Sequence, residues 1–426
     1  MKVLLAPLGS RGDVQPQLVL GEELLRRGHT VTLAASPNFR PWAESRGFAF
    51  VPVGEDINAI IRQNRHMTEQ HPVVALPGQI RLVRRHLADQ ARDLFAAPQG
   101  YDIVVAAGLS LVAKMLADSL GVPHVFCCYS LSMMHSAAHP PALTPVFGLP
   151  RLGNRALWLA ITTLFEVTLG GPLNDLRRAR GLAPYASSWR AIHGTQVLLA
   201  QDSVMGELPA DAPGENVQVP ALVPRPERAA PLSDALEGFL SGAARSASPV
   251  VYLGFGSMPS VDRAHVVDVA RELSEHHGAR VLLHSSHAEE AGVELPPGVL
   301  AVGDVDHQSL FPRVELIVHH GGAGTTAAAL RSGVPQLVVP HIVDQFFHGR
   351  RVAELGLGPT AVPKAELSSG AIAAALADRF KYLANAQAVR ASVKQAGGAV
   401  QAADHLEALV RASGTAARSL PLGRHA

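Results

Sequence analysis

The sequence predicts an α/β protein made of two domains of similar plan, each with a parallel sheet and helices on both of its faces. Short β-branched apolar runs alternate with helical patterns in both halves of the chain, which is typical of parallel sheets. Between the halves, residues 207–248 are rich in proline and poor in periodicity, as in an interdomain linker. The length of 426 residues also exceeds what one domain usually holds.

The two halves repeat the same alternation. In the first half, the expected strands are 3–6, 30–34, 48–53, 102–106 and 123–128, and the expected helices are 14–27, followed by Gly28, and 111–120. In the second half, the expected strands are 249–254, 280–284, 316–319 and 336–340, and the expected helix is 264–277. Because strands separated by helices favour parallel pairing, each half should form its own sheet.

The composition of the chain also predicts where its domains end. Residues from about Ser368 are rich in alanine and helical in pattern, and a polar tail follows them. We therefore expect an N-terminal domain over 1–222, a linker over 223–248, a C-terminal domain over 249–395, and a C-terminal helix with its tail over 396–426.

Charge and cysteine content exclude several classes of function. A net charge of +1 gives no case for nucleic-acid binding. Cys127 and Cys128 are adjacent, which disfavours a disulfide and fits a reducing compartment. Without a signal peptide or a run of about 18 apolar residues, we expect a cytoplasmic protein with no stable membrane insertion. The basic amphipathic segment 81–95 is either a solvated helix face or a weak membrane-surface contact.

The strongest chemical signal is HHGGAGTTAAALRSGVPQLVVP, residues 319–340. A strand ends at the histidine pair, a glycine-rich turn follows, and a helix opens near Thr325. Glycines let backbone N–H groups approach an anion, and a helix N-terminus adds partial positive charge. His320 beside the turn can donate a hydrogen bond to a phosphate oxygen. The segment lacks the P-loop and dinucleotide-binding patterns, so it predicts a phosphate site of another kind.

The dipeptide Asp344-Gln345 follows a strand and turn and starts a helix. A carboxylate beside a carboxamide can accept from and donate to neighbouring sugar hydroxyls. Helix N-capping is an alternative explanation for Asp344 alone. The dipeptide is therefore a candidate sugar site.

A second glycine turn, GFGSM at residues 254–258, lies at the carboxyl end of another expected strand. Open α/β sheets bind ligands at this edge, so Ser257 is a candidate phosphate ligand. Asp304 and Asp306 resemble a metal-binding pair, but no further carboxylate or histidine has metal-ligand spacing. We expect no metal site.

The first turn of the chain, GSRGDVQP at residues 9–16, has two interpretations. Arg11-Gly12-Asp13 is a tripeptide found in cell-adhesion ligands, but the absence of a secretion signal disfavours that function. The alternative is the floor of an active site at the end of the first strand.

Together, GSRGDVQP and HHGGAGTTAAALRSGVPQLVVPHIVDQFFHGRRVAELGLGP resemble the family 1 glycosyltransferases of the GT-B fold. The most similar branch contains sterol glucosyltransferases, rhamnolipid rhamnosyltransferases and bacterial enzymes that glycosylate antibiotics. The resemblance covers both halves in the same order and includes the linker. It implies two Rossmann-like domains facing each other across a cleft, with the nucleotide-sugar on the C-terminal domain and the acceptor on the N-terminal one.

The resemblance also implies a role for each matching residue. Asp13 aligns with a histidine that is the catalytic base in many relatives, and aspartate replaces it here as in the sterol and glycopeptide branches. The carboxylate that orients this histidine has no counterpart in AAGLS, residues 106–110, which fits a base that is itself a carboxylate. Asp13 could alternatively only orient the acceptor. The implied donor site is Gly12, Ser257, Val305, His320, Gly322, Ala323, Gly324, Thr325, Asp344 and Gln345. The backbone of Val305 is the part expected to contact the base of the nucleotide.

The expected reaction is an inverting transfer of a hexose or 6-deoxyhexose from a UDP- or TDP-sugar, without a metal or other cofactor. Asp13 accepts the proton of an acceptor hydroxyl, which attacks C1 of the sugar, while His320 and the glycine turn stabilise the leaving diphosphate. The apolar stretch within 131–180 favours a lipophilic acceptor such as a sterol, a polyketide aglycone or a hydroxy-fatty acid. The expected acceptor pocket is Met133, Met134, His135, Trp158 and Phe165.

Two other functions are compatible with this architecture. A nucleotide-sugar 2-epimerase would show no dependence on an acceptor. A non-catalytic activator of another glycosyltransferase would be expected to lack Asp13 or the His320 turn, and both are present. The sequence allows either a monomer or a homodimer.

Overall fold

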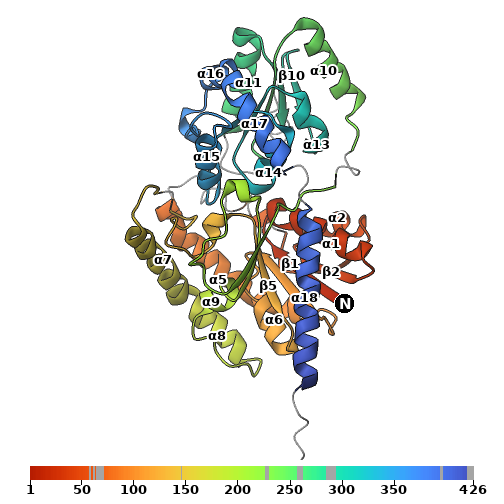
Figure 1. Ribbon diagram of the computed structural model, residues 1–426, viewed down its shortest axis with the longest axis vertical. Coiled ribbons are helices and arrows are strands. Elements are labelled where there is room, and N and C mark those ends of the chain that lie inside the picture. The colour runs from red at the N-terminus through yellow and green to blue at the C-terminus, as the bar shows by residue number, and fades with distance from the viewer. Residues whose placement is uncertain are drawn as a thin grey trace, which may run out of the picture.

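Two α/β domains lie one above the other along the long axis of the molecule (Figure 1), which confirms the predicted fold class. The computed structural model describes residues 1–56, 59–60, 63, 72–144, 146–225, 230–256, 262–284, 294–393 and 397–419. Ser257, one of the predicted donor ligands, lies outside these residues. The domain boundaries at 222, 248 and 395 stay predictions.

The N-terminal domain is built on a seven-stranded sheet in the order β3-β2-β1-β4-β5-β6-β7, in which neighbouring strands are parallel. Its strands are β1 (Lys2–Leu8), β2 (Thr30–Ala35), β3 (Ala49–Pro52), β4 (Ile103–Gly108), β5 (His124–Cys128), β6 (Gln196–Ala200) and β7 (Glu215–Val219). The inner strands are buried along most of their length, as expected for a sheet covered on both faces.

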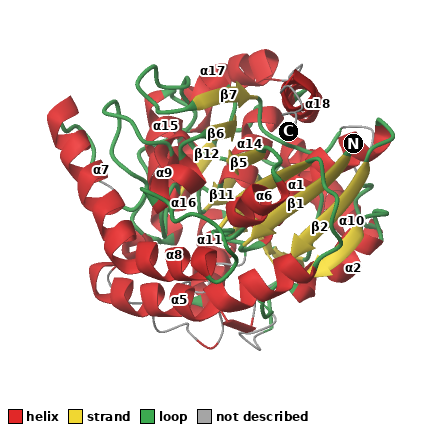
Figure 2. Ribbon diagram, turned by 90° about the horizontal axis from the view of Figure 1, so that it is seen from below, coloured by secondary structure: helices red, strands yellow, loops and turns green. Residues whose placement is uncertain are grey.

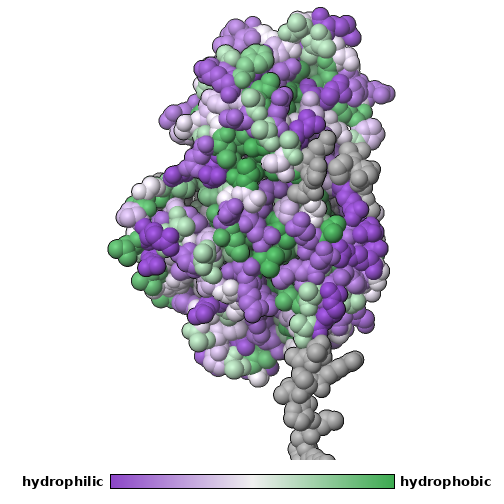
Figure 3. Space-filling view, in the orientation of Figure 1, coloured by the Kyte–Doolittle hydropathy of each residue, from purple (hydrophilic) through white to green (hydrophobic). Residues whose placement is uncertain are grey.

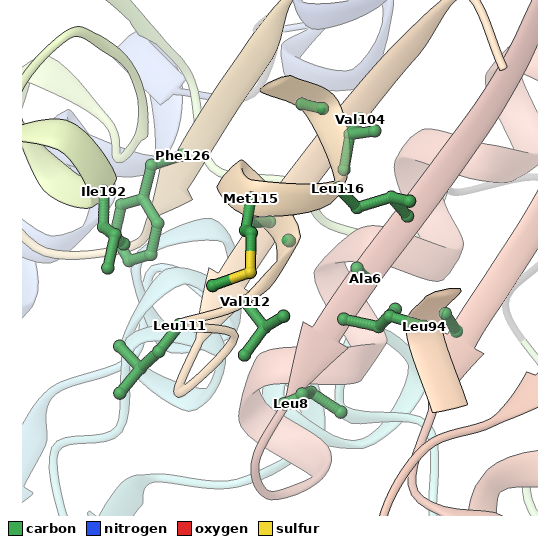
Figure 4. Close-up of a cluster of buried hydrophobic side chains, with 14 of the residues drawn as sticks. Ala6, Leu8, Leu94, Val104, Leu111, Val112, Met115, Leu116, Phe126 and Ile192 are labelled. Carbon is green, nitrogen blue, oxygen red and sulfur yellow. The ribbon is translucent and has the colours of Figure 1, made fainter. Parts of the chain in front are cut away.

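Helices cover both faces of this sheet, as the view along the molecule shows (Figure 2). Side chains from α5, α6, α8 and α9 pack on one face, and side chains from α1 and α18 pack on the other. Figure 4 shows part of the first cluster, in which Phe126 of β5 lies beside Ile192 of α9. The helical elements are α1 (Arg11–Arg26), η1 (Pro37–Phe39), α2 (Arg40–Glu44), α5 (Pro72–Ala96), α6 (Ala113–Leu120), η2 (Leu131–Met133), α7 (Arg151–Phe165), the π-helical η3 (Glu166–Gly170), α8 (Gly171–Arg178), α9 (Ser188–His193) and η4 (Ser203–Met205).

The C-terminal domain repeats the plan with a five-stranded sheet in the order β10-β9-β8-β11-β12, again with parallel neighbours. Its strands are β8 (Val250–Gly254), β9 (Arg280–His284), β10 (Val299–Val302), β11 (Leu316–His319) and β12 (Gln336–Val338). Its helical elements are α10 (Asp234–Ser246), α11 (Arg263–His277), α13 (His307–Leu310), η6 (Phe311–Arg313), α14 (Ala323–Ser332), α15 (Gln345–Glu354), η7 (Lys364–Glu366), α16 (Ser369–Ala377) and α17 (Arg379–Val393).

Helix α1, strand β7 and helix α10 are three of the elements that differ from the sequence prediction, which also lacks β6 and β10. Helix α1 begins at Arg11 rather than at residue 14, because Ser10 caps it, so the RGD tripeptide forms the first helical turn. The proline-rich stretch contains β7, the outer strand of the first sheet. It also contains α10, whose Leu236 and Phe239 pack under the second sheet. The sequence did not predict the short strand β7 or the helix α10, because both lie between proline-rich turns.

The segment Arg151–Arg178 is 28 residues long and contains an 18-residue window with a mean hydropathy of 1.4, so it is apolar enough to cross a membrane by length and composition. It holds no uninterrupted run of 18 apolar residues, because Asn154, Arg155 and Glu166 interrupt the sequence, so the sequence prediction did not include it. The structure folds this segment as α7, η3 and α8, which belong to the N-terminal domain.

The two domains contact each other directly at several points. Arg331 of α14 donates two hydrogen bonds to the Asp202 carboxylate, at 2.7 and 2.8 Å. Arg351 of α15 donates to the carbonyls of Val204 and Met205, each at 3.1 Å. Buried bidentate arginine–carboxylate pairs fix both distance and orientation, so these bonds hold the two domains in register.

The last helix, α18 (Gly398–Ser419), returns from the C-terminal domain to the N-terminal one, where it lies against α1. Ala402, Ala403 and Leu406 are buried in the cluster behind the first sheet. Arg27, the C-cap of α1, pairs with Asp404 at 2.7 Å and with Glu407 at 3.1 Å. The helix therefore closes the core behind the helix that carries Asp13.

We predict that Leu406→Ala lowers the free energy of unfolding of the N-terminal domain by about 2–4 kcal/mol, because it leaves a cavity at a fully buried position. Gln401→Ala, an exposed position on the same helix, is the control and should change it little. Denaturant unfolding followed by circular dichroism measures both. Equal stability of the two variants would show that α18 does not support this core.

Candidate active site

The first helix places Asp13 at the carboxyl end of β1, facing the other domain. Ser10 is the N-cap and Asp13 is the third helical residue, and together they form a capping box. The Ser10 backbone N–H donates to Oδ2 of Asp13 at 2.8 Å, and the Ser10 hydroxyl donates to the same oxygen at 3.3 Å. The start of the helix thus fixes the carboxylate.

Two glycines make room for this carboxylate. A Cβ on Gly9 would overlap Oδ2 of Asp13, and a Cβ on Gly108 would lie 2.7 Å from Oδ1. Gly108 also has a φ of 63°, which disfavours side chains. The sequence prediction for residues 106–110 concerned a missing acid and did not include this role of Gly108. Gly108 lies near Asp13 only because β4 pairs with β1.

Withdrawal from water raises the pKa of Asp13 to about 6, because burial disfavours the charged carboxylate. Hydrogen bonds from Ser10 oppose the shift, and the negative charge of Asp344 on the other domain adds to it. Burial also raises the pKa of Asp344. Two carboxylates from different domains therefore share one poorly solvated region.

On the C-terminal domain, the predicted glycine turn joins β11 to α14. Gly322 is the N-cap of α14, and the first α-helical backbone bond here runs from the N–H of Thr326 to the Gly322 carbonyl. The N–H groups of Ala323, Gly324 and Thr325 therefore have no partner inside the helix. Free N–H groups at a helix N-terminus make an anion site.

Two histidines hold the peptide groups of Gly321 in this turn. Nδ1 of His319 accepts from the Gly321 N–H at 3.1 Å, while its Nε2 donates to Oε1 of Gln336 at 3.0 Å. Nδ1 of His348 donates to the Gly321 carbonyl at 2.7 Å, which assigns this nitrogen as the protonated one. Gly321 has a φ of 85°. We call this arrangement the histidine clamp; sequence analysis missed it because α15 brings His348 to the turn from a distant part of the chain.

His320, the predicted phosphate ligand, lies beside the same turn. Burial, followed by the neighbouring histidines, holds the pKa of His320 well below its usual range, so the imidazole is neutral at neutral pH. Its Nδ1 has no hydrogen-bond partner within the described part of the chain. A Cβ on Gly322 would overlap Nε2 of His320, so the glycine lets the ring lie over the helix start.

The loop before α15 holds Asp344 and Gln345. Gln345 is buried, and its Oε1 accepts from the N–H groups of His341 and Ile342, at 2.8 and 3.1 Å. Val343 has a φ of 51°, which costs a β-branched residue about 1–3 kcal/mol. The Asp344 side chain makes no capping bond to its helix, so N-capping does not explain it. A strained backbone thus presents a carboxylate that does not cap its helix.

The predicted residues around β10 have different roles. Val305 lies in the loop that follows β10, half-buried against the core under the sheet. Asp304 pairs with Arg11 across the two domains. Asp306 caps α13 by accepting from the Gln308 N–H at 2.8 Å. No group of three metal-ligating side chains occurs among the described residues, and the aspartate pair has structural partners.

The predicted acceptor residues lie close together, but as packed core. Trp158 is 1% exposed, and its indole N–H donates to the His139 carbonyl at 3.1 Å. His135 lies against Trp158, with ring centroids 5.0 Å apart. Phe165 meets the ring of Trp189 edge-on at 5.3 Å. Met134 is buried and Met133 packs against the same core. Their large apolar area is used for packing.

A pocket of about 480 Å³ opens beside this core, between the loops after β5 and β6 and helix α15. Of the residues predicted for the acceptor, none lines it. Its lining includes Leu131, His139, Phe147, Met205, Phe347 and Arg350. Sequence analysis could not find it, because its walls come from both domains.

A narrower crevice of about 30 Å³ lies near the glycine turn. Pro16 and Tyr129 line it from the N-terminal domain, and Gly324 and His348 line it from the C-terminal one. The glycine-rich turn therefore opens toward α1, the helix that carries Asp13.

Two facing Rossmann-like domains, with a glycine-rich helix start on one and a buried carboxylate on the other, have the arrangement of a GT-B glycosyltransferase. Residues 3–129 match the glycosyltransferase family 28 N-terminal domain, and residues 269–409 match the C-terminal domain of erythromycin biosynthesis protein CIII-like proteins. The chain belongs to the family of antibiotic and sterol glycosyltransferases, as the relatives below show, and is an enzyme of this class.

Three relatives illustrate the breadth of this family. Glycosyltransferase GtfE of Amycolatopsis orientalis is 35% identical over 96% of this chain and 98% of its own. The vancomycin aglycone glucosyltransferase of the same organism is 33% identical over the same shares. A sterol 3-beta-glucosyltransferase, UGT80B1 of Arabidopsis thaliana, is 31% identical over 86% of this chain and 61% of its own. Antibiotic and sterol enzymes thus both resemble this chain.

Solved structures share the fold. The glycosyltransferase of kitacinnamycin superposes with a TM-score of 0.69 at 20% identity, covering 96% of this chain and 98% of its own. Glycosyltransferase VinC in complex with thymidine diphosphate (TDP) superposes with a TM-score of 0.68 at 23% identity, covering 97% of this chain and 100% of its own. These likenesses confirm the GT-B architecture.

We predict that Gly322→Ala lowers both thermal stability and TDP affinity, because the new Cβ forces the His320 ring to move. Gly324→Ala is the matched control two residues on, where a Cβ meets nothing within 4 Å and alanine suits a helix better than glycine. Its stability should be equal or higher. A fall in TDP affinity for Gly324→Ala would then report a contact with the ligand itself. Unchanged TDP binding by Gly322→Ala would contradict this site.

We also predict that His348→Phe weakens TDP binding about five- to tenfold, because the Gly321 carbonyl loses its buried donor. His348→Asn retains a donating N–H group and should recover part of the affinity. Isothermal titration calorimetry measures both variants. If His348→Asn binds as poorly as His348→Phe, the imidazole has a role other than donating to Gly321.

Proposed function

We propose that this chain transfers a hexose or 6-deoxyhexose, with inversion, from a TDP- or UDP-sugar to the hydroxyl of a lipophilic acceptor, with Asp13 as the base. The observation that carries the proposal is the Asp13 carboxylate, which is held by a capping box and has a pKa raised to about 6. A base with such a pKa is ionised at neutral pH and still strong enough to accept a proton.

The attacking hydroxyl would lie between Asp13 and C1 of the sugar. Asp13 accepts its proton as the new C–O bond forms, and the bond from C1 to the diphosphate breaks on the opposite face. Holding both reactants in line contributes a large part of the rate. Asp344 and Gln345 are proposed to hold the sugar; the strained loop at Val343 supports this role for the Asp344 carboxylate.

The leaving diphosphate would be stabilised at the start of α14. The free N–H groups of residues 323–325 and the helix dipole favour its negative charge. Neutral His320 can add a hydrogen bond without a counter-charge. On this proposal the protein supplies the stabilisation itself and needs no metal.

The acceptor is proposed to enter the pocket of about 480 Å³ rather than the aromatic core at Trp158. Leu131, Phe147 and Phe347 give this pocket apolar walls, which supports a lipophilic alcohol. One relative is named a sterol 3-beta-glucosyltransferase, and a sterol is a lipophilic alcohol. TDP- and UDP-sugars both stay candidates for the donor.

We predict that Asp13→Asn abolishes glycosyl transfer, by at least about 10²-fold, while the variant still binds TDP. The assay incubates TDP- and UDP-sugars with pooled hydrophobic alcohols and detects the glycoside by its mass. Asp304→Asn, on the other side of the interdomain contact with Arg11, is the control and should retain transfer. Near wild-type turnover by Asp13→Asn would refute the base assignment. Conversion of the donor without any acceptor would indicate a 2-epimerase instead.

A further inference from the structure

Exposed apolar side chains gather on one segment of the N-terminal domain. Five of the nine large hydrophobic residues that are exposed in the described part of the chain lie between residues 143 and 167. They are Leu143, Val146, Leu152, Leu159 and Val167, which we call the apolar ridge. In Figure 3 hydrophobic side chains come to the surface where α7 projects from the domain.

Three residues of the ridge lie on α7 and η3, and Leu143 and Val146 lie before α7. Leu152 and Leu159 are seven residues apart on α7 and therefore lie on the same side of this helix, where they are 74% and 67% exposed. Val167, in the π-helical η3 that continues α7, is 78% exposed. Soluble proteins seldom leave such a row of large apolar side chains in water without a partner.

The opposite face of the same helix is anchored in the protein. Trp158 is buried, and Nδ2 of Asn154 donates to the Ala137 carbonyl at 3.0 Å. Glu166 accepts from the Ser187 hydroxyl and the Trp189 N–H, each at 2.8 Å. Although Arg151–Arg178 is apolar enough to span a membrane, these bonds keep α7 on the domain surface, so the helix can lie on a bilayer but not cross it.

The charges along the ridge favour an anionic surface. Arg155 lies on the ridge itself, three residues after Leu152 and four before Leu159, and is exposed. Glu166 is the one acidic residue between 143 and 167 in the sequence, and its carboxylate is turned inward. If a second copy of the chain packed ridge to ridge, the arginine of each copy would face no acidic side chain on the other. An anionic bilayer supplies that opposite charge.

The ridge also leads to the proposed acceptor pocket. Leu143 and Val146 are 51% and 50% exposed, and the next residues, Phe147, Gly148 and Leu149, line the pocket. We propose that the apolar ridge docks this enzyme on the surface of a bilayer that contains anionic lipids. The link from bilayer to pocket rests on the proposed lipophilic acceptor; the docking itself does not.

Co-sedimentation with vesicles tests the docking. The full-length protein should sediment with vesicles of phosphatidylcholine and phosphatidylglycerol, and more weakly with phosphatidylcholine alone. Leu159→Glu should lower the partition coefficient by at least about tenfold, and Arg155→Gln by about fivefold on the anionic vesicles. Phe380→Glu, at an exposed apolar residue of α17 in the other domain, is the matched control and should bind as wild type.

Three results would overturn the docking: no sedimentation of the wild type with anionic vesicles, equal binding by Leu159→Glu, or a wild-type dimer that Leu159→Glu converts to a monomer without any vesicle binding. Light scattering after size exclusion detects the last of these, in which a second copy covers the ridge. TDP affinity, measured in parallel, should be the same in Leu159→Glu and wild type. If the wild-type protein binds vesicles but transfers no sugar, the proposed function is refuted and the docking is not.

Discussion

One electrostatic constraint underlies the site of this enzyme: Asp13 and Asp344 reach the same poorly solvated cleft from different domains. Burial disfavours the charge on each of them, and the charge of Asp344 makes that of Asp13 less favourable still. The two carboxylates repel each other, so the surrounding structure must hold both of them in place. The capping box fixes one, and the loop at Val343 presents the other.

The rest of the fold maintains this relation between the domains. Arg331 and Arg351 bridge them by hydrogen bonds to Asp202 and to the loop after β6. Helix α18 crosses back and completes the core behind α1. Because a charge across the cleft adds to the effect of burial in raising the pKa of Asp13, the domain contact is also part of the proposed chemistry. A similar dependence applies to the pocket, whose walls come from both domains.

The architecture and the glycine-rich turn between β11 and α14 could be predicted from the sequence, because both rest on local signals. Apolar runs mark the strands, and the glycines after His320 mark the turn. The histidine clamp, the glycine at 108 and the pocket depend on residues far apart in the chain, and one sequence carries no signal for their proximity. The predicted acceptor residues Trp158 and Phe165 do not line the pocket of about 480 Å³ and their role stays a prediction, because large aromatic side chains mark a core as readily as a binding surface.

The most direct test of the paired carboxylates is the pH dependence of kcat/KM. A base must be deprotonated, so the rate should fall as the pH drops below about 6, the raised pKa of Asp13. Asp344→Asn removes a charge that raises this pKa, and in its residual activity the acid limb should move to lower pH. A wild-type limb near 4, the ordinary value for aspartate, or a limb that Asp344→Asn leaves unmoved, would contradict the account.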